Sequence, residues 1–361
     1  MGLEFKLSDR ELPVSPVFVH FLAQVIQGTP FDREIWPEQR SELLSPHEVD
    51  PIQITKAAMI VMGSTVGRER IARAYTLLFS LLTGDVSRVQ ELQSRFHFVS
   101  FIGIPRTGGS YLTAELYRAL GIDPAHVPNG LAHDSFPEAG PFRLQPGVNS
   151  WVVSLKTMAE YLTMVAILFG ERPSHSGKIV VPKKLTKAAY AGGFFHRIFG
   201  DQTEWVLTVR HPVASCVSTY EKSGGLPIGG SFTVRSNIEE WCLRDLQEMG
   251  CGTDEPANMD YFGAYLRYWE HYYSLLAMTG LFASRHLKVI GFSKSALESG
   301  AQGYHDRYGS GLQAAEFHAS DSARRRHSEW IERAQPAIDR VAAAWKSAGT
   351  AFPAADIESC W

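Results

Sequence analysis

The stretch that decides the fold is residues 96–112, FHFVSFIGIPRTGGSYL. Its first half, 96–103, is rich in aromatic and β-branched residues and ends at a glycine, which is typical of a buried strand. The next segment, Ser110–Leu120, has apolar residues at helical spacing and is followed by Gly121, the residue type common just past a helix end. The stretch therefore predicts a strand, a glycine-rich turn and a helix.

The turn between this strand and this helix has the composition of an anion-binding loop. The first N–H groups of a helix lack intrahelical partners, and the helix dipole adds positive charge there. Gly108 and Gly109 let the main chain curl around an anion, Arg106 adds a fixed charge, and Ser110 can cap the helix or bond a ligand oxygen. The alternative is an ordinary glycine turn that carries a surface arginine.

The loop differs from a Walker A motif at one position. That motif would place a lysine at residue 109, where this chain has glycine. Because the lysine normally stabilises the β and γ phosphates, its absence disfavours a conventional ATPase or GTPase.

A second strand-to-helix junction lies at residues 204–220, EWVLTVRHPVASCVSTY. Arg210 ends the strand, Pro212 stands at a favourable early helix position, and Ser218 lies two turns into the helix. An arginine and a hydroxyl placed in this way can converge on one phosphate. Taken alone, the pattern fits a buried salt bridge and an ordinary helix serine equally well.

Together the two junctions resemble the nucleotide motifs of the sulfotransferases that use 3′-phosphoadenosine 5′-phosphosulfate (PAPS). That family carries Pro-Lys/Arg-Ser/Thr-Gly-Thr/Gly-Thr/Ser after its first strand, and residues 105–110 are PRTGGS. Its 3′-phosphate motif has a serine eight residues after an arginine, the spacing of Arg210 and Ser218. The resemblance covers residues 96–220. It implies a P-loop-type fold and metal-free, in-line sulfuryl transfer from PAPS to a hydroxyl, with release of 3′-phosphoadenosine 5′-phosphate (PAP).

The resemblance also implies roles for individual residues. Arg106 would stabilise charge on the bridging oxygen as it leaves, and Arg210 and Ser218 would bind the 3′-phosphate and select PAPS over ATP. The 5′ end of the nucleotide would be held by Arg106, Thr107, Gly108, Gly109, Ser110 and Tyr111.

Residues 178–185, KIVVPKKL, have the pattern of a strand that ends in two lysines. In the family, a lysine at the end of the strand before the 3′-phosphate motif often touches the transferring group. Lys183 and Lys184 are both candidates for this role, and a solvated charge pair is the alternative. Many relatives place a catalytic histidine two residues after that lysine, but Leu185 and Thr186 stand there in this chain.

The general base is therefore sought in the segment 129–138, NGLAHDSFPE, where other branches of the family carry an acidic residue or a histidine. His133 is the first choice, because imidazole titrates near neutrality. Asp134 could orient His133 or act in its place, and Glu138 ranks third. An ordinary loop histidine is an equally good interpretation of His133.

Two rival functions stay open at this point. A P-loop small-molecule kinase would need magnesium and usually an aspartate at a strand end, which the ends at Val181-Pro and Val209-Arg do not offer. A catalytically inactive PAP- or PAPS-binding protein is allowed by the missing Lys-x-His pattern.

The composition of the 361-residue chain is that of a globular protein, with 45% hydrophobic and 20% charged residues. A net charge of −3 argues against nucleic-acid binding and against broad membrane-surface binding. The longest apolar stretch, 161–170, is too short to cross a bilayer, so we expect no integral membrane segment and assign the stretch to a buried helix. Four cysteines without metal or disulfide spacing, together with a charged N-terminus, predict a cytoplasmic protein.

The chain is predicted to form one sulfotransferase-like domain, residues 1–361, with a helical extension over 1–95 and a nucleotide-binding α/β core over 96–361. Helical spacing is clear at 17–25, 54–62 and 70–82. Further strands are expected at 178–181, 204–209 and 286–291. Strands that alternate with helices predict a central parallel sheet flanked by helices, a three-layer fold of the P-loop type.

Several further features lie outside the two motifs. Residues 298–311 are expected to form a surface loop, and a long helix at 328–348 is expected to kink or shorten at Pro336. The aromatic run at 261–273 is more typical of core packing than of a substrate wall, and the basic run 324–326 is more typical of a solvated segment than of a 3′-phosphate site. The acceptor is expected to be a small molecule, lipid or glycan with a hydroxyl. Residues 1–95 could build its pocket or a homodimer contact.

Overall fold

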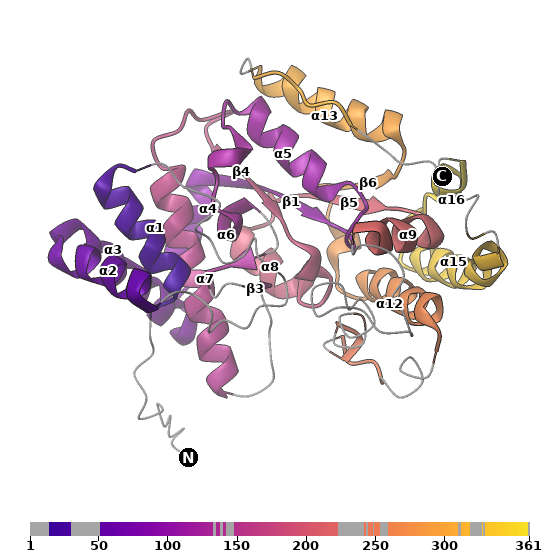
Figure 1. Cartoon of the computed structure of the whole chain (residues 1–361), viewed down its shortest axis with the longest axis horizontal. Coiled ribbons are helices and arrows are strands. Elements are labelled where there is room, and N and C mark those ends of the chain that lie inside the picture. Colours follow the sequence, from indigo (N-terminus) through magenta and orange to yellow (C-terminus); the bar gives the residue numbers. More distant parts are fainter. Residues whose placement is uncertain are drawn as a thin grey trace.

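A computed structural model of the chain describes residues 14–29, 51–132, 135–137, 140–141, 148–222, 242, 245–247, 249–252, 259–309, 312–317, 327 and 329–359. Within these residues the protein has an α/β fold in which helices cover both faces of a central sheet (Figure 1). The predicted fold class is confirmed to this extent.

The central sheet contains four parallel strands in the order β4-β1-β5-β6. They are β1 (Phe96–Ile102), β4 (Ile179–Lys184), β5 (Glu204–Val209) and β6 (Leu287–Gly291). From β1 the chain first adds β4 on one side and then returns to add β5 on the other. The carboxyl ends of β1 and β5 therefore flank the point where the strand order reverses, which is where open α/β sheets bind their ligands.

Strand β1 is hydrophobic along its whole length because both of its faces are buried. Phe96, Phe98 and Ile102 pack into one apolar cluster, whereas Val99 and Phe101 pack into a second cluster on the opposite face. This alternation is the period-2 pattern of a strand whose two sides both meet helices.

Two helices cover the face of the sheet that holds the smaller cluster. They are α5 (Gly109–Ala119) and α13 (Lys294–Tyr308), which pack against each other. The larger cluster lies on the other face and is covered by α7 (Val148–Leu168), α8 (Gly192–Phe199), α9 (Pro212–Lys222) and α12 (Tyr261–Leu276).

The remaining C-terminal and central elements are peripheral. Helix α15 (Glu329–Ser347) packs outside α12 and against α9, and α16 (Ala354–Ser359) lies near β6. Between α5 and α7 the described chain forms α6 (Asn129–Ala132) and a two-stranded ribbon of β2 (Ser135–Phe136) and β3 (Gly140–Pro141).

The N-terminal helices form a separate layer at one end of the molecule, drawn in indigo and violet in Figure 1. They are α1 (Pro16–Gln27), α2 (Pro51–Gly63) and α3 (Thr65–Thr83). The helix that follows, α4 (Ser87–Arg95), leads into the sheet and packs against β1 and α8. Helix α3 joins this layer to the core by packing along α7. The helical segments predicted from the spacing at 17–25, 54–62 and 70–82 are confirmed.

Helix α7 contains most of the long apolar stretch at 161–170. The window Trp151–Leu168 is long and apolar enough to cross a bilayer by length and composition, but 72% of it is buried within the protein. This burial is the pattern of a core helix, and no integral membrane segment is indicated among the described residues.

One expectation about the C-terminal half was wrong, and a second, that the last long helix would be shortened at Pro336, was wrong as well. Residues 298–308 are not a loop but part of α13, whose Leu297, Ala301 and Tyr304 pack into the smaller cluster. Helix α15 does not end at Pro336, because that residue lies on the exposed side, where water can satisfy the carbonyl that loses its N–H partner, while Ile338 anchors the buried side.

Candidate active site

The loop after β1 has a backbone that requires glycine at two points. Gly103 has φ +139°, and a Cβ added there would lie 2.5 Å from the Thr208 hydroxyl oxygen. Gly108 has φ +93°, and its Cβ would lie 2.7 Å from the Leu297 side chain of α13. The loop is therefore pressed between β5 and α13. Arg106 also adopts a left-handed conformation, with φ +68°, which is rare for a residue with a side chain.

The loop and the β5–α9 junction meet through three predicted site residues. The Arg106 Nε–H donates a hydrogen bond to the Ser218 hydroxyl oxygen at 3.0 Å. The Arg210 guanidinium donates to the Arg106 carbonyl oxygen at 3.1 Å. Residues that are more than a hundred positions apart in sequence are thus in direct contact, because β1 and β5 are neighbours in the sheet.

Arg210 is held rigidly although it follows the end of its strand. It is only 6% exposed, and its guanidinium carbon lies 4.0 Å from the centre of the Phe292 ring. The Trp269 indole N–H donates to the Arg210 carbonyl at 3.0 Å. Since packing on an aromatic face fixes the plane of a guanidinium, the direction of its N–H groups is set in advance.

Lys184, the last residue of β4, lies beside the loop that follows β1. Its ammonium donates to the Thr186 hydroxyl at 2.8 Å, and Thr186 in turn donates to the Gly103 carbonyl at 3.1 Å. Its Cε would lie 3.7 Å from a Cβ placed on Gly109. Gly109 is the position at which a Walker A loop carries its own lysine. The side chain of Lys184, supplied by β4, therefore passes close to where that lysine would start.

Lys183 points to the opposite face of the sheet, as alternation along a strand requires. It is fully buried, and its ammonium lies 4.1 Å from the centre of the Phe136 ring and 5.0 Å from that of Tyr161. The structure thus separates two lysines that the sequence left equivalent: Lys184 is at the loop, and Lys183 is in an aromatic environment beside β2 and α7.

Thr107 supports the loop from within. Its hydroxyl donates to the Ile104 carbonyl and contacts the Thr208 hydroxyl, each at 2.7 Å, and the residue is 1% exposed. The whole residue is therefore buried, and its side chain has a structural role within the loop.

Helix α12 supports the strand ends through two residues of the aromatic run, for which the sequence favoured core packing over a substrate wall. The Tyr272 hydroxyl donates to the Thr186 carbonyl at 2.8 Å and accepts from the Gly103 N–H at 3.1 Å. The Tyr273 hydroxyl donates to the Thr208 carbonyl at 2.9 Å, and burial raises the pKa of Tyr273 well above its ordinary value, so it stays a neutral donor. The aromatic run is buried, as predicted, and it also fixes the loop.

An aromatic row extends from Arg210 along the rim of the loop. Phe292, which stacks on Arg210, lies 5.7 Å from Phe317 between ring centres, and Phe317 lies 4.8 Å from Tyr111. The main chain near Phe317 is tied to α5, because the Ala315 N–H donates to the carboxylate of Glu115 and the Tyr111 hydroxyl donates to the Ala315 carbonyl at 3.3 Å. Burial, followed by the Glu115 charge, raises the pKa of Tyr111.

Other predicted residues lie outside the described part of the chain. These are His133, Asp134 and Glu138, the candidates for general base, and the basic run 324–326. Among the described residues, no three His, Cys, Asp or Glu side chains gather in a way that could hold a metal ion.

No family model, curated protein or solved structure matches this chain.

Proposed function

We propose that this protein transfers the sulfuryl group of PAPS to a hydroxyl of a small molecule, lipid or glycan and releases PAP. The observation that carries the proposal is the meeting of Arg106, Arg210 and Ser218 at the carboxyl ends of two adjacent parallel strands. Two arginines and a hydroxyl from two separate motifs converge there. This donor set suits a ligand with more than one phosphate-like group.

The 3′-phosphate is assigned to Arg210 and Ser218. The guanidinium of Arg210 is oriented by Phe292, so it loses little freedom when it binds an anion. The Ser218 hydroxyl, which now accepts from Arg106, has a proton that it can donate to a phosphate oxygen. A nucleotide without a 3′-phosphate would leave these donors without their ligand, and that difference is the basis of selectivity for PAPS over ATP.

The 5′-phosphosulfate is assigned to the loop and the start of α5. Helix α5 begins at Gly109, and the main-chain N–H groups in the first turn of a helix point out of its N-terminus, here toward the loop. Together with the helix dipole they provide a site for negative charge. Arg106 stands at the rim of this site and can contribute N–H groups to either end of the nucleotide.

Lys184 is the lysine assigned to the transferring group. During transfer the acceptor oxygen forms a bond to sulfur, the bond from sulfur to the bridging oxygen breaks, and the acceptor proton passes to a base. Negative charge therefore grows on the 5′-phosphate side of the broken bond. A cation beside the loop, which is where Lys184 lies, stabilises that charge as it develops. His133 is the first candidate for the base, followed by Asp134 and then Glu138.

The adenine ring is assigned to the aromatic row. Tyr111 follows directly after the loop, and its ring is paired with Phe317. Bases stack on aromatic faces without needing specific hydrogen bonds. A nucleotide with its 5′ end at α5 and its 3′-phosphate at Arg210 would place its base near this row.

The proposal is tested by calorimetric titration of the purified protein with PAP and, separately, with ATP plus magnesium. Tight binding of PAP with little response to ATP is expected, and labelled PAPS can then be used to screen acceptors. Binding of ATP that requires magnesium, with no response to PAP, would overturn the proposal and favour a P-loop kinase.

A further inference from the structure

Helix α2 (Pro51–Gly63) is apolar on its outward side as well as on its inward side. Ala57 and Val61 face the protein and are 4% and 0% exposed. On the opposite side Ile52, Met59 and Met62 are 64%, 70% and 56% exposed. Surface helices normally place polar residues outward, so this helix presents an apolar stripe that nothing within the described part of the chain covers.

The stripe continues around the corner into α3 (Thr65–Thr83). Val66, in the first turn of α3, is 47% exposed. The guanidinium of Arg68 lies across the corner and donates to the Met62 carbonyl and to the Thr65 hydroxyl. We define the α2–α3 patch as Ile52, Met59, Met62 and Val66 together with the cations Lys56 and Arg68.

The charge around the patch is strongly positive. Residues 51–73 contain Lys56, Arg68, Arg70 and Arg73 and a single acid, Glu69, so their net charge is 4 − 1 = +3, whereas the whole chain carries −3. Lys56, Arg70 and Arg73 form no ion pair with any other described residue. This part of the surface therefore has an electrostatic character opposite to that of the protein as a whole.

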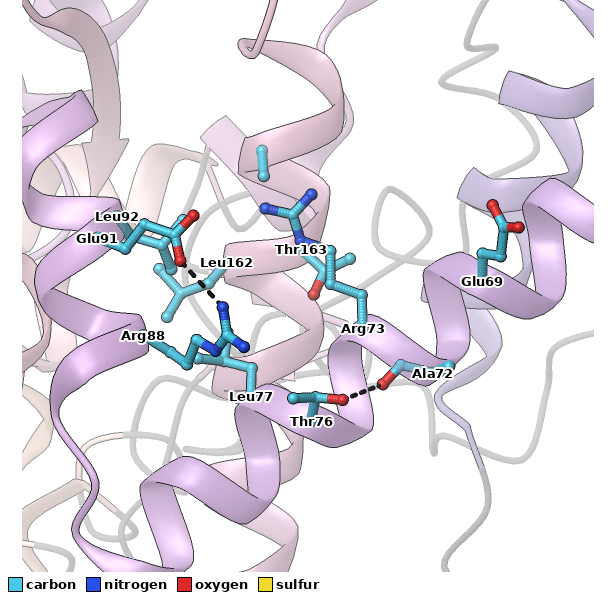
Figure 2. A pocket seen from close by; sticks show the side chains of 11 residues that line it. Glu69, Ala72, Arg73, Thr76, Leu77, Arg88, Glu91, Leu92, Leu162 and Thr163 are labelled. Carbon is cyan, nitrogen blue, oxygen red and sulfur yellow. Dashed lines mark hydrogen bonds and ion pairs between the residues drawn. The ribbon is translucent and has the colours of Figure 1, made fainter.

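A groove of about 490 Å³ lies next to the patch and is lined by apolar and charged groups (Figure 2). Its two arginines, Arg73 and Arg88, are balanced by Glu69 and Glu91, and Arg88 pairs with Glu91 at 3.3 Å. The excess of positive charge therefore belongs to the patch and not to the groove. The groove runs between α3, α4 and α7, and Leu77, Leu92 and Leu162 contribute apolar lining. Arg73 reaches over it toward Thr163, as Figure 2 shows. The residues Val66, Glu69 and Arg73 are spaced three and four apart, so the patch and the wall of the groove share one face of α3.

We propose that this N-terminal layer docks on an anionic lipid surface. In this arrangement the side chains of the α2–α3 patch enter the boundary between headgroups and acyl chains, and Lys56, Arg68 and Arg73 face the phosphates of the headgroups. Exposed apolar side chains flanked by cations are what interfacial helices use to bind such surfaces. The inference goes beyond the proposed function and does not depend on it.

A second copy of the chain fits the patch less well. A two-fold contact would bring each patch against its own image, so that cationic surfaces would face one another. Helix α2 contains no acidic residue that could pair with Lys56 across such a contact. Charge complementarity thus favours an anionic surface over self-association.

The experiment is co-sedimentation of the full chain with vesicles of phosphatidylcholine alone and with vesicles in which about one third of the lipid is phosphatidylserine. The protein is expected to sediment with the anionic vesicles, to do so less at high salt, and to stay in solution with the neutral ones. The double variant Met59→Glu with Met62→Glu should weaken binding about tenfold or more. Lys56→Gln should weaken it about fivefold. Met278→Glu is the matched control, because Met278 is 73% exposed but lies outside the patch at the end of α12, and it should bind like the wild type.

Three results would overturn the proposal. The first is a wild-type protein that does not sediment with anionic vesicles, and the second is an equal loss of binding in the Met278→Glu control. The third is a dimer, found by light scattering without vesicles, that the double variant dissociates, since the patch would then be a self-association surface. The circular dichroism and thermal unfolding of each variant establish that it is folded.

Discussion

The Nε–H of Arg106 donates a hydrogen bond to the Ser218 hydroxyl at 3.0 Å, although 112 positions separate the two residues in the chain. Arg106 follows β1 and Ser218 lies in the helix that follows β5, and these two strands are hydrogen-bonded neighbours. The contact brings together two motifs that the sequence presented separately. A second contact, from the Arg210 guanidinium to the Arg106 carbonyl, helps to hold the left-handed backbone of Arg106.

Replacing Ser218 with alanine should weaken PAP binding and leave the fold intact. The variant removes a donor assigned to a phosphate, and hydrogen bonds to charged groups contribute about 1.5–3 kcal/mol, or roughly tenfold to a hundredfold in affinity. The measurement is calorimetric titration with PAP, accompanied by thermal unfolding without ligand.

Thr219→Ala is the control for this variant. It lies next to Ser218 on the same helix, but its hydroxyl donates to the Ser215 carbonyl at 2.7 Å. PAP should bind to this control within about twofold of wild type. Equal losses in the two variants would mean that the effect comes from the helix and not from the Ser218 hydroxyl.

The two lysines at the end of β4 should respond differently to substitution by methionine. Lys184→Met removes a cation at the loop and should reduce PAP affinity about tenfold and turnover by a larger factor. Lys183→Met keeps an apolar side chain of similar length between Phe136 and Tyr161 and should leave PAP affinity unchanged. The opposite pattern, with PAP affinity lost only in Lys183→Met, would reverse the assignment of the two residues.

Gly108→Ala should destabilise the protein, whereas Gly303→Ala should stabilise it. At Gly108 the positive φ and the contact with Leu297 both oppose a Cβ, with an expected cost of about 1–3 kcal/mol. At Gly303, in the exposed side of α13, a Cβ meets nothing within 4 Å, so the gain in helix propensity should add about 0.5–1 kcal/mol. Urea unfolding measures both changes. A Gly108→Ala protein as stable as wild type would show that the loop can adopt another conformation.

Glu204 should contribute to stability at neutral pH and lose that contribution in acid. A hydrogen bond with His97, aided by the charge of Arg307, lowers the pKa of Glu204 against the opposing effect of burial. Because the folded-state pKa is below the unfolded one, the stabilisation is present above the unfolded pKa and disappears as pH falls through the folded pKa.

The corresponding measurement compares wild type with Glu204→Gln by urea unfolding across pH. The variant should be less stable by about 1 kcal/mol at pH 7, a modest value because the side chain is partly exposed. This difference should shrink between about pH 5 and pH 3. A constant difference over that range would show that the carboxylate charge is not the source of the stabilisation.

The strands and helices near the motifs were predictable because their apolar patterns are unambiguous. Strand β5 has the predicted bounds, Glu204–Val209. Its mostly apolar run is buried on both sides of the sheet, begins at Glu204 and ends before Arg210. Helix α13 was not predictable, because its glycines favour a loop locally and only packing of residues such as Leu297 against α5 makes the helix stable.

The composition of the site was partly predictable, and its geometry was not. Alternation along β4 requires Lys183 and Lys184 to point in opposite directions, but which of them meets the loop depends on which face of the sheet receives α5. In the same way, the contact between Arg106 and Ser218 depends on the strand order. The contributions of Tyr272 and Thr186 arise from helix α12 crossing the strand ends, which no local pattern encodes.

The central claim is that Arg210 recognises a 3′-phosphate. The most direct test measures the binding of two nucleotides, with and without that phosphate, to the wild type and to an Arg210 variant. PAP and AMP differ only in that phosphate, so their calorimetric affinities are compared in the wild type and in Arg210→Lys, which keeps the charge but loses the guanidinium fork. The account predicts that wild type binds PAP about a hundredfold more tightly than AMP, and that this ratio falls at least about tenfold in the variant while AMP affinity changes little. Equal binding of the two nucleotides by the wild type, or an equal loss for both in the variant, would contradict it.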